Sequence, residues 1–140
     1  SDGPLGKLII EQVSDALIYA DRSARIVRWN SAACQLLGYS MAEALSSGLD
    51  LIIPEHLRVA HWASFKATID SGRNKLQGHP TLTRAARKGG QKFYIEMTYT
   101  LVKDPGGVAI GSVVMARDAI DESKSNARPV ALVRTAHVIL

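Results

Sequence analysis

The chain has 140 residues, of which 46% are apolar and 21% charged, which is the balance of one globular domain with its own core. Its single cysteine, Cys34, excludes an internal disulfide and fits a reducing compartment. No apolar run is long enough to span a membrane and no signal peptide is present, so we expect a cytoplasmic location. The net charge of +4 comes from basic residues scattered along the chain, which argues against a nucleic-acid surface.

The amino terminus divides into two parts. Residues 1–7 are polar and rich in glycine and proline, so we expect a tag-like or disordered segment before the domain. The residues that follow, up to Ser14, carry apolar side chains on one side and predict a helical turn or two. Leu8, Ile9 and Val13 would present an apolar face to a partner in a homodimer.

Two strands and two short helices follow. Residues 16–20 and 25–29 have the composition and alternation of strands with a tight connection between them, which predicts a hairpin. Asn30 is favoured at a helix N-cap and begins a helix that we expect to end at Gly38. A further helical turn is expected over residues 41–45.

A longer helix is predicted between Pro54, which suits a first turn, and Gly72, which suits a left-handed end. Four side chains recur at spacings of 4, 4 and 3 residues and share one face of this helix: Leu57, His61, Phe65 and Thr68. The imidazole of His61 therefore points with the apolar residues. If that face lines a cavity, His61 is the residue that could hold a metal or a cofactor.

The rest of the chain predicts three more strands. Residues 75–87 indicate one strand or a bent strand pair, residues 93–102 alternate cleanly, and residues 108–117 form the last strand. Glycine-rich hairpin turns separate them at residues 88–91 and 103–107. Two strands, several short helices and three strands predict an α+β fold, in which short helices cover one face of a five-stranded antiparallel sheet.

Residues 123–140 are expected to be a linker or tail outside the domain. Residues 128–140 are apolar and β-prone, and three interpretations stay open: pairing with a sheet edge, pairing with another chain, or a cloning-derived segment.

No residue pattern predicts an enzyme. The chain has no nucleophile with a plausible base, no glycine-rich phosphate loop and no paired carboxylates at a useful spacing. The histidines lack the cysteine or carboxylate spacing of a zinc site. Cys34 is expected to be a small apolar residue of the first helix.

Four motifs in order resemble the PAS sensor family, over residues 8–122. They are Trp29-Asn30 at the end of the second strand, Gly38-Tyr39 after the first helix, Lys88-Gly89-Gly90 at a hairpin tip and Arg117-Asp118-Ala119-Ile120 at the exit. The hairpin departs mildly from the Lys-Asp-Gly of the family. The resemblance implies the PAS fold, a sensory role and an output domain outside this chain.

The central stretch resembles the haem-binding (FixL-like) subgroup of that family, in which a histidine seven residues after a proline binds haem iron. Pro54 and His61 stand at that interval here. The resemblance implies haem b as cofactor, His61 as metal ligand and a diatomic gas (O2, CO or NO) as signal. A neutral imidazole on a buried helix face is a suitable axial ligand.

Further cofactor-binding residues follow from the same resemblance. Lys75 would neutralise a haem propionate. Four residues would form the wall opposite the histidine: Thr81, Leu82, Val113 and Met115. At the position where such oxygen sensors carry a distal arginine, this chain has Thr81, so oxygen-specific hydrogen bonding from an arginine is not expected.

The expected mechanism is a population shift, in which ligand binding changes how the cofactor contacts the strands. Residues 118–122 would carry that change to the output domain. The alternative is a haemless PAS module that dimerises or binds a small organic ligand. An absorption spectrum of protein made with haem supplied separates the two.

Overall fold

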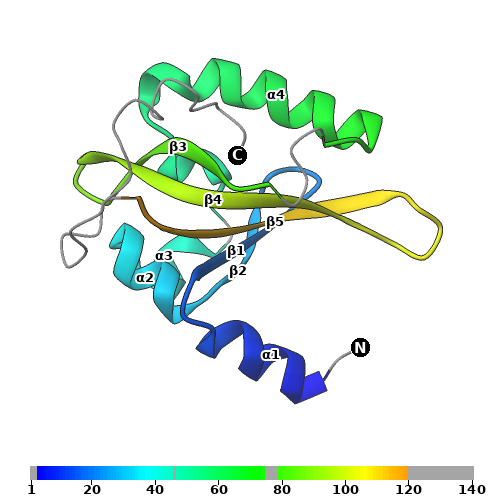
Figure 1. Ribbon diagram of the computed structural model, residues 1–140, viewed down its shortest axis with the longest axis horizontal. Coiled ribbons are helices and arrows are strands. Elements are labelled where there is room, and N and C mark those ends of the chain that lie inside the picture. The colour runs from blue at the N-terminus through cyan, green and yellow to red at the C-terminus, as the bar shows by residue number, and fades with distance from the viewer. Residues whose placement is uncertain (1–2, 46, 75–78, 120–140) are drawn as a thin grey trace.

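The computed structural model describes residues 3–45, 47–74 and 79–119. At its centre is one antiparallel sheet with the strand order β2-β1-β5-β4-β3 (Figure 1). The strands are β1 (Ala16–Asp21), β2 (Ile26–Trp29), β3 (Thr81–Ala86), β4 (Lys92–Lys103) and β5 (Ala109–Asp118). The helices are α1 (Gly3–Gln12), α2 (Ser31–Leu37), α3 (Met41–Ala44), the 3-10 turns η1 (Leu49–Ile52) and η2 (Glu55–Leu57), and α4 (Arg58–Ser71). The predicted α+β fold with a five-stranded antiparallel sheet is confirmed.

The register of the sheet divides its side chains between two faces. Residues directly opposite each other on paired strands share a face, and Val114 of β5 stands opposite both Tyr99 of β4 and Ile18 of β1. These three side chains are buried and define the inner face. Intervening residues such as Thr98 and Met115 point to the opposite, outer face.

Three helices cover the inner face. Ala33 of α2, Ala44 of α3, and Phe65 and Ile69 of α4 belong to the same buried cluster as the inner-face residues of the sheet. One hydrophobic core therefore lies between these helices and the sheet. Helix α1 has no buried residue and lies on the far side of the molecule from α4 (Figure 1).

Asn30 fixes the junction between α1, β1 and α2. Its Oδ1 accepts hydrogen bonds from the backbone N–H of Leu17 (2.9 Å) and of Ala33 (3.0 Å). Its Nδ2 donates to the carbonyl oxygens of Ile10 (2.9 Å) and Asp15 (3.1 Å). The side chain thus acts as the N-cap of α2, as the sequence predicts, and also joins two other segments to it.

The long helix begins later than predicted. The 3-10 turn η2 separates Pro54 from α4, which starts at Arg58 and ends at Gly72 in the left-handed conformation with φ 69°. The buried side chains of α4 are His61, Phe65 and Ile69, whereas Leu57 and Thr68 are only half-buried. The inward-facing row therefore keeps a strict spacing of four residues, and His61 lies on it.

The ends of the chain differ from expectation or lie outside the described residues. Helix α1 starts at Gly3 with Pro4 in its first turn, so residues 3–7 are helical and not a disordered terminus. The predicted linker and tail at residues 123–140, the end of the exit segment and residues 75–78 are not among the described residues.

Candidate functional site

His61 is the one imidazole that α4 turns into the core. Its exposed fraction is 0%, and its ring lies 5.2 Å from the ring of Trp62 and 6.1 Å from that of Phe65, centroid to centroid. Both ring nitrogens are buried, and neither has a hydrogen-bond partner among the described residues. Buried polar atoms are almost always paired, so the two unpaired nitrogens make His61 the first candidate for a ligand-binding side chain.

Burial lowers the pKa of His61 from 6.5 to about 4, and the nearby carboxylate of Asp50 opposes that shift. The ring is therefore neutral at physiological pH. A neutral imidazole has one nitrogen with a free lone pair, which is the form that binds metals. The site thus contains an imidazole in the protonation state that can bind a metal, buried from water.

The predicted wall opposite His61 is only partly formed. Thr81 stands opposite the buried Met97 and therefore points to the inner face. Three other predicted residues lie on the outer face: Leu82, Val113 and Met115. Each stands opposite an outer-face residue of β4, namely Glu96, Thr100 and Thr98 respectively. The prediction that these three face the histidine is wrong. Lys75 is not among the described residues.

A group of hydroxyls lines the inner face instead. Their oxygen atoms are buried without a hydrogen-bond partner among the described residues, and they belong to Thr81, Thr83, Tyr99 and Ser112. Sequence reasoning did not select the last three. The clean alternation of β4 places Tyr99 in phase with Ile95 and Met97, and that phase was the available signal that its hydroxyl enters the core.

Burial raises the pKa of Tyr99, and the Ser112 hydroxyl next to it partly opposes the shift. The Ser112 hydroxyl acts on the phenol as a hydrogen-bonding neighbour, although the two oxygens fall outside strict hydrogen-bond geometry. The phenol is therefore protonated at neutral pH and its O–H is available as a donor. The candidate site therefore combines the neutral imidazole of His61, on α4, with hydroxyl groups on the strands.

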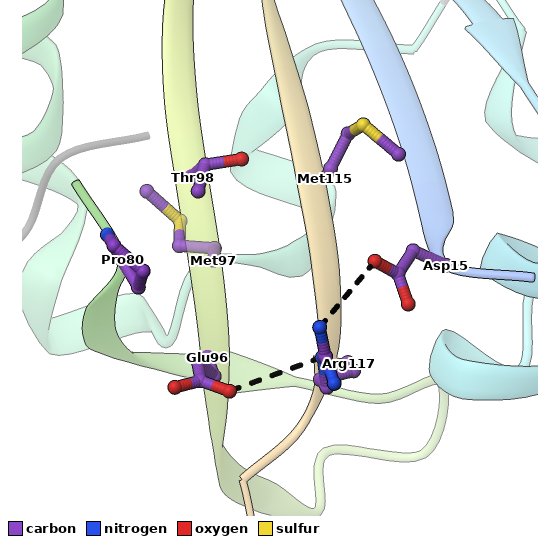
Figure 2. A pocket seen from close by; sticks show the side chains of 7 residues that line it. All are labelled: Asp15, Pro80, Glu96, Met97, Thr98, Met115 and Arg117. Carbon is purple, nitrogen blue, oxygen red and sulfur yellow. Dashed lines mark ion pairs between the residues drawn. The ribbon is translucent and has the colours of Figure 1, made fainter. Parts of the chain in front are cut away.

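A separate hollow of about 290 Å³ opens on the outer face (Figure 2). Arg117 lies in it between Asp15 and Glu96, with N–O distances of 3.9 Å and 3.8 Å. Long ion pairs made by an exposed arginine contribute little to stability. Its other lining residues are Pro80, Met97, Thr98 and Met115. Thr98 and Met115 point away from the core, so the hollow opens mainly on the outer face.

The end of β5 is tied to the rest of the domain through Arg87. Its Nη2 lies 3.0 Å from Oδ2 of Asp118, and its Nε donates to the carbonyl oxygen of Leu36 (3.0 Å). Its guanidinium also lies 3.6 Å from the ring centroid of Phe93. One half-buried arginine therefore joins the exit from the sheet to the end of α2.

The helices gathered on the inner face of the sheet and the buried polar atoms beneath them define an α+β domain with its candidate site between helices and sheet. A model of the family described as the PAS fold matches residues 5–119. That match covers most of the chain. The chain belongs to the PAS family.

Known proteins of this family show both sequence and structural similarity. Oxygen sensor protein DosP of Escherichia coli (strain K12) is 24% identical over 110 residues, which are 79% of this chain and 14% of DosP. The chain thus spans a small part of that protein's length. The PAS domain of a protein from Colwellia psychrerythraea superposes with a TM-score of 0.66 at 20% identity, covering 81% of this chain and 93% of that one.

A further similar structure is that of an RNA-binding light-oxygen-voltage receptor. Its TM-score is 0.68 at 22% identity, with coverage of 82% of this chain and 32% of that chain. At these identities the structural likeness establishes the fold. PAS domains are in general sensory modules that commonly dimerise and connect to output domains. In the described part of the chain, no helix has the length and apolar character needed to cross a bilayer.

Proposed function

We propose that this PAS domain binds haem b through His61 and senses a diatomic gas, O2, CO or NO. One observation carries the proposal: a fully buried, neutral imidazole on the core side of α4 with neither nitrogen hydrogen-bonded. A single histidine would suffice as protein ligand, because the four nitrogen atoms of the porphyrin would supply most of the remaining ligands of iron. Ligation would satisfy one of the two unpaired nitrogens.

The neighbours of His61 suit this role. Trp62 and Phe65 place aromatic carbon beside the ring of His61, which is fully buried. Asp50 is near enough to raise the pKa of His61 electrostatically. A carboxylate hydrogen-bonded to the second nitrogen is the usual way in which a ligating histidine is oriented, so Asp50 is the candidate for that part. Haem, when bound, supplies an iron atom able to take up the gas.

The similarity to DosP supports the same function, since that protein is named an oxygen sensor and its similarity covers 79% of this chain. The spacing of Pro54 and His61 adds support from this chain alone. Together they favour haem over a small organic ligand as occupant of the inner-face site.

The path of the signal would run along β5. Val114 and Ala116 of β5 face the core, and Asp118, at the end of that strand, pairs with Arg87. A change in how the ligand packs against the inner face would therefore shift the population between two arrangements of the Arg87–Asp118 ion pair. The full-length protein would be a cytoplasmic signalling protein with its output domain outside this chain.

The second candidate function is a haemless module that acts by dimerising. Helix α1 favours this function, because it exposes an apolar face made of Leu5, Leu8 and Ile9. Such a face is a typical contact surface between protomers. A homodimer through α1 is compatible with haem binding as well, so the absorption spectrum decides between the two functions.

The test is the spectrum of protein produced with haem supplied. We expect a Soret band in the wild type and its loss or strong displacement in His61→Ala. His56→Ala is the matched control, since His56 is exposed in η2 and should leave the band unchanged. Far-UV circular dichroism verifies that each variant is folded. A wild-type protein with no Soret band overturns the haem proposal.

A further inference from the structure

The two edges of the sheet differ in how they are covered. The sheet ends at β2 on one side and at β3 on the other (Figure 1). The edge of β2 is partly covered, because the N–H of Ile26 donates to the carbonyl oxygen of Ser47 (2.8 Å). In the described part of the chain, no segment pairs with the outer edge of β3. The edge of β3 is therefore the place where a further strand could be added.

The hairpin that follows β3 fixes which backbone groups of this strand bond to β4. The N–H of Arg87 donates to the carbonyl oxygen of Gln91 (2.9 Å). The preceding residue, Ala86, stands opposite Lys92 and therefore belongs to a pair whose N–H and C=O groups point away from each other. Because such pairs alternate along an antiparallel ladder, every second residue of β3 directs its backbone groups away from β4.

Three residues of β3 therefore turn their N–H and C=O groups to the open edge: Leu82, Arg84 and Ala86. None of these groups has a hydrogen-bond partner among residues 3–45, 47–74 and 79–119. Leu82 is only 7% exposed, although it lies on the outer face and outside the hydrophobic core cluster. Buried backbone groups are nearly always paired, so this edge is the first candidate for pairing with a segment outside the described residues.

We propose that residues 129–140 of the same chain pair with β3 as a sixth strand of the sheet. The inference does not depend on the proposed haem function. The segment is apolar and has no acidic residue. Pro129, which lacks an N–H, is its first residue, a position where strands tolerate proline. Residues with a branched β-carbon favour strands, and the segment has five: Val130, Val133, Thr135, Val138 and Ile139.

The chain leaves the sheet within reach of this edge. Asp118, the last residue of β5, stands opposite Ile95, which in turn stands opposite Thr83 of β3. A strand beyond β3 would lie three strand spacings from β5, or about 14 Å. Residues 119–128 can span about 33 Å when extended, so they are long enough to make the connection. Because β5 and β3 run in the same direction, a segment that turns back along the edge would run antiparallel to β3.

The β3 strand of a second copy fits this edge less well. If two copies paired through all three outward residues of each β3, two-fold symmetry would place Arg84 directly opposite the partner's Arg84. Like charges directly opposite each other across a strand pair are destabilising. Residues 129–140 contain one arginine, Arg134, and pairing registers exist that keep it away from Arg84.

Pairing at this edge would hold β3 from both sides. The strand carries Thr81 and Thr83, whose hydroxyl oxygens are buried on the inner face. The segment that follows the domain would then be joined to the strand that carries these hydroxyls.

The test is hydrogen exchange of the β3 amides, measured by NMR on the full chain at neutral pH. We expect the three outward amides of β3 to exchange about tenfold more slowly in the wild type than in the double variant Leu132→Pro, Val133→Pro. Successive residues of a strand point their N–H groups to opposite sides, so one of the two prolines must remove a donor to β3. Equal exchange in the two proteins overturns the inference.

Two controls make the comparison specific. The amides of Thr83 and Ala85 bond to β4, so they should exchange slowly in every variant and show that the sheet is intact. The double variant Ser123→Pro, Lys124→Pro places two prolines in the polar segment before the proposed strand and should leave the outward amides protected. Equal loss of protection in that control would overturn the inference. Protection that disappears on dilution would also overturn it, because the strand would then come from a second copy.

Discussion

Acid should destabilise the haem-free wild-type domain more than the same domain carrying His61→Leu. The pKa of His61 is about 4 in the folded protein and 6.5 when the ring is exposed to water. Between these values the unfolded chain binds a proton that the folded chain does not, so stability falls as the pH falls. Above pH 6.5 neither state is protonated and this contribution disappears.

The size of the effect follows from the shift. Each pKa unit corresponds to about 1.4 kcal/mol, so the wild type should lose about 3 kcal/mol across the window that His61→Leu does not lose. At neutral pH the free energy of unfolding of His61→Leu should already exceed that of the wild type by about 1–3 kcal/mol, because an apolar side chain of similar size replaces two unpaired buried nitrogens. The other titrating groups are shared by both proteins and cancel in the comparison.

The assay is urea unfolding of both haem-free proteins at a series of pH values. The difference in unfolding free energy should widen steadily below pH 6.5 and level off near pH 4. His56→Leu is the control, because it removes an exposed histidine of η2 and leaves the core unchanged. Parallel curves for the wild type and His61→Leu would refute the reasoning, since they would mean that the ring reaches water or is held protonated by Asp50.

Two further predictions concern the frame and the dimer. Asn30→Ala should lower the free energy of unfolding by about 3–5 kcal/mol, because it leaves buried partners on three segments unpaired. Ser40→Ala, which removes an exposed cap, should lower it by about 1 kcal/mol. Equal losses in the two variants would contradict the junction role of Asn30. The double variant Leu8→Glu, Ile9→Glu should convert a dimer to a monomer, as measured by light scattering. Val59→Glu, on the exposed side of α4, is the control and should leave the dimer intact. An unchanged mass in the double variant would exclude α1 as the dimer contact.

The fold was predictable because local signals agree with one another along most of the chain. Asn30 and Gly72 mark helix ends through backbone chemistry that does not depend on distant contacts. The hairpin turns fix antiparallel pairing between neighbouring strands. The start of α4 was less accessible, since Pro54 suits a 3-10 turn as well as the first turn of an α-helix.

The walls of the site were less predictable because β3 and β5 carry misleading patterns. In β5, Val113, Val114 and Met115 are consecutive apolar residues, so alternation cannot show which of them faces the helices. In β3 the usual pattern is reversed, with Thr81 pointing inward and Leu82 outward. Only the register with β4 reveals this, and that register depends on contacts far apart in the sequence.

The reversed pattern of β3 is itself informative about function. β3 turns Thr81 and Thr83 toward the helices, and the hydroxyl oxygens of both are buried without a partner among the described residues. Local departures from the most stable arrangement of this kind concentrate at functional sites. His61, Tyr99 and Ser112 share the same cost, because each buries polar atoms without a partner. A ligand that pairs with them offsets that cost on binding and so stabilises the folded domain. Ligand binding and the rigidity of the inner face are therefore linked, which is the property that a sensor needs.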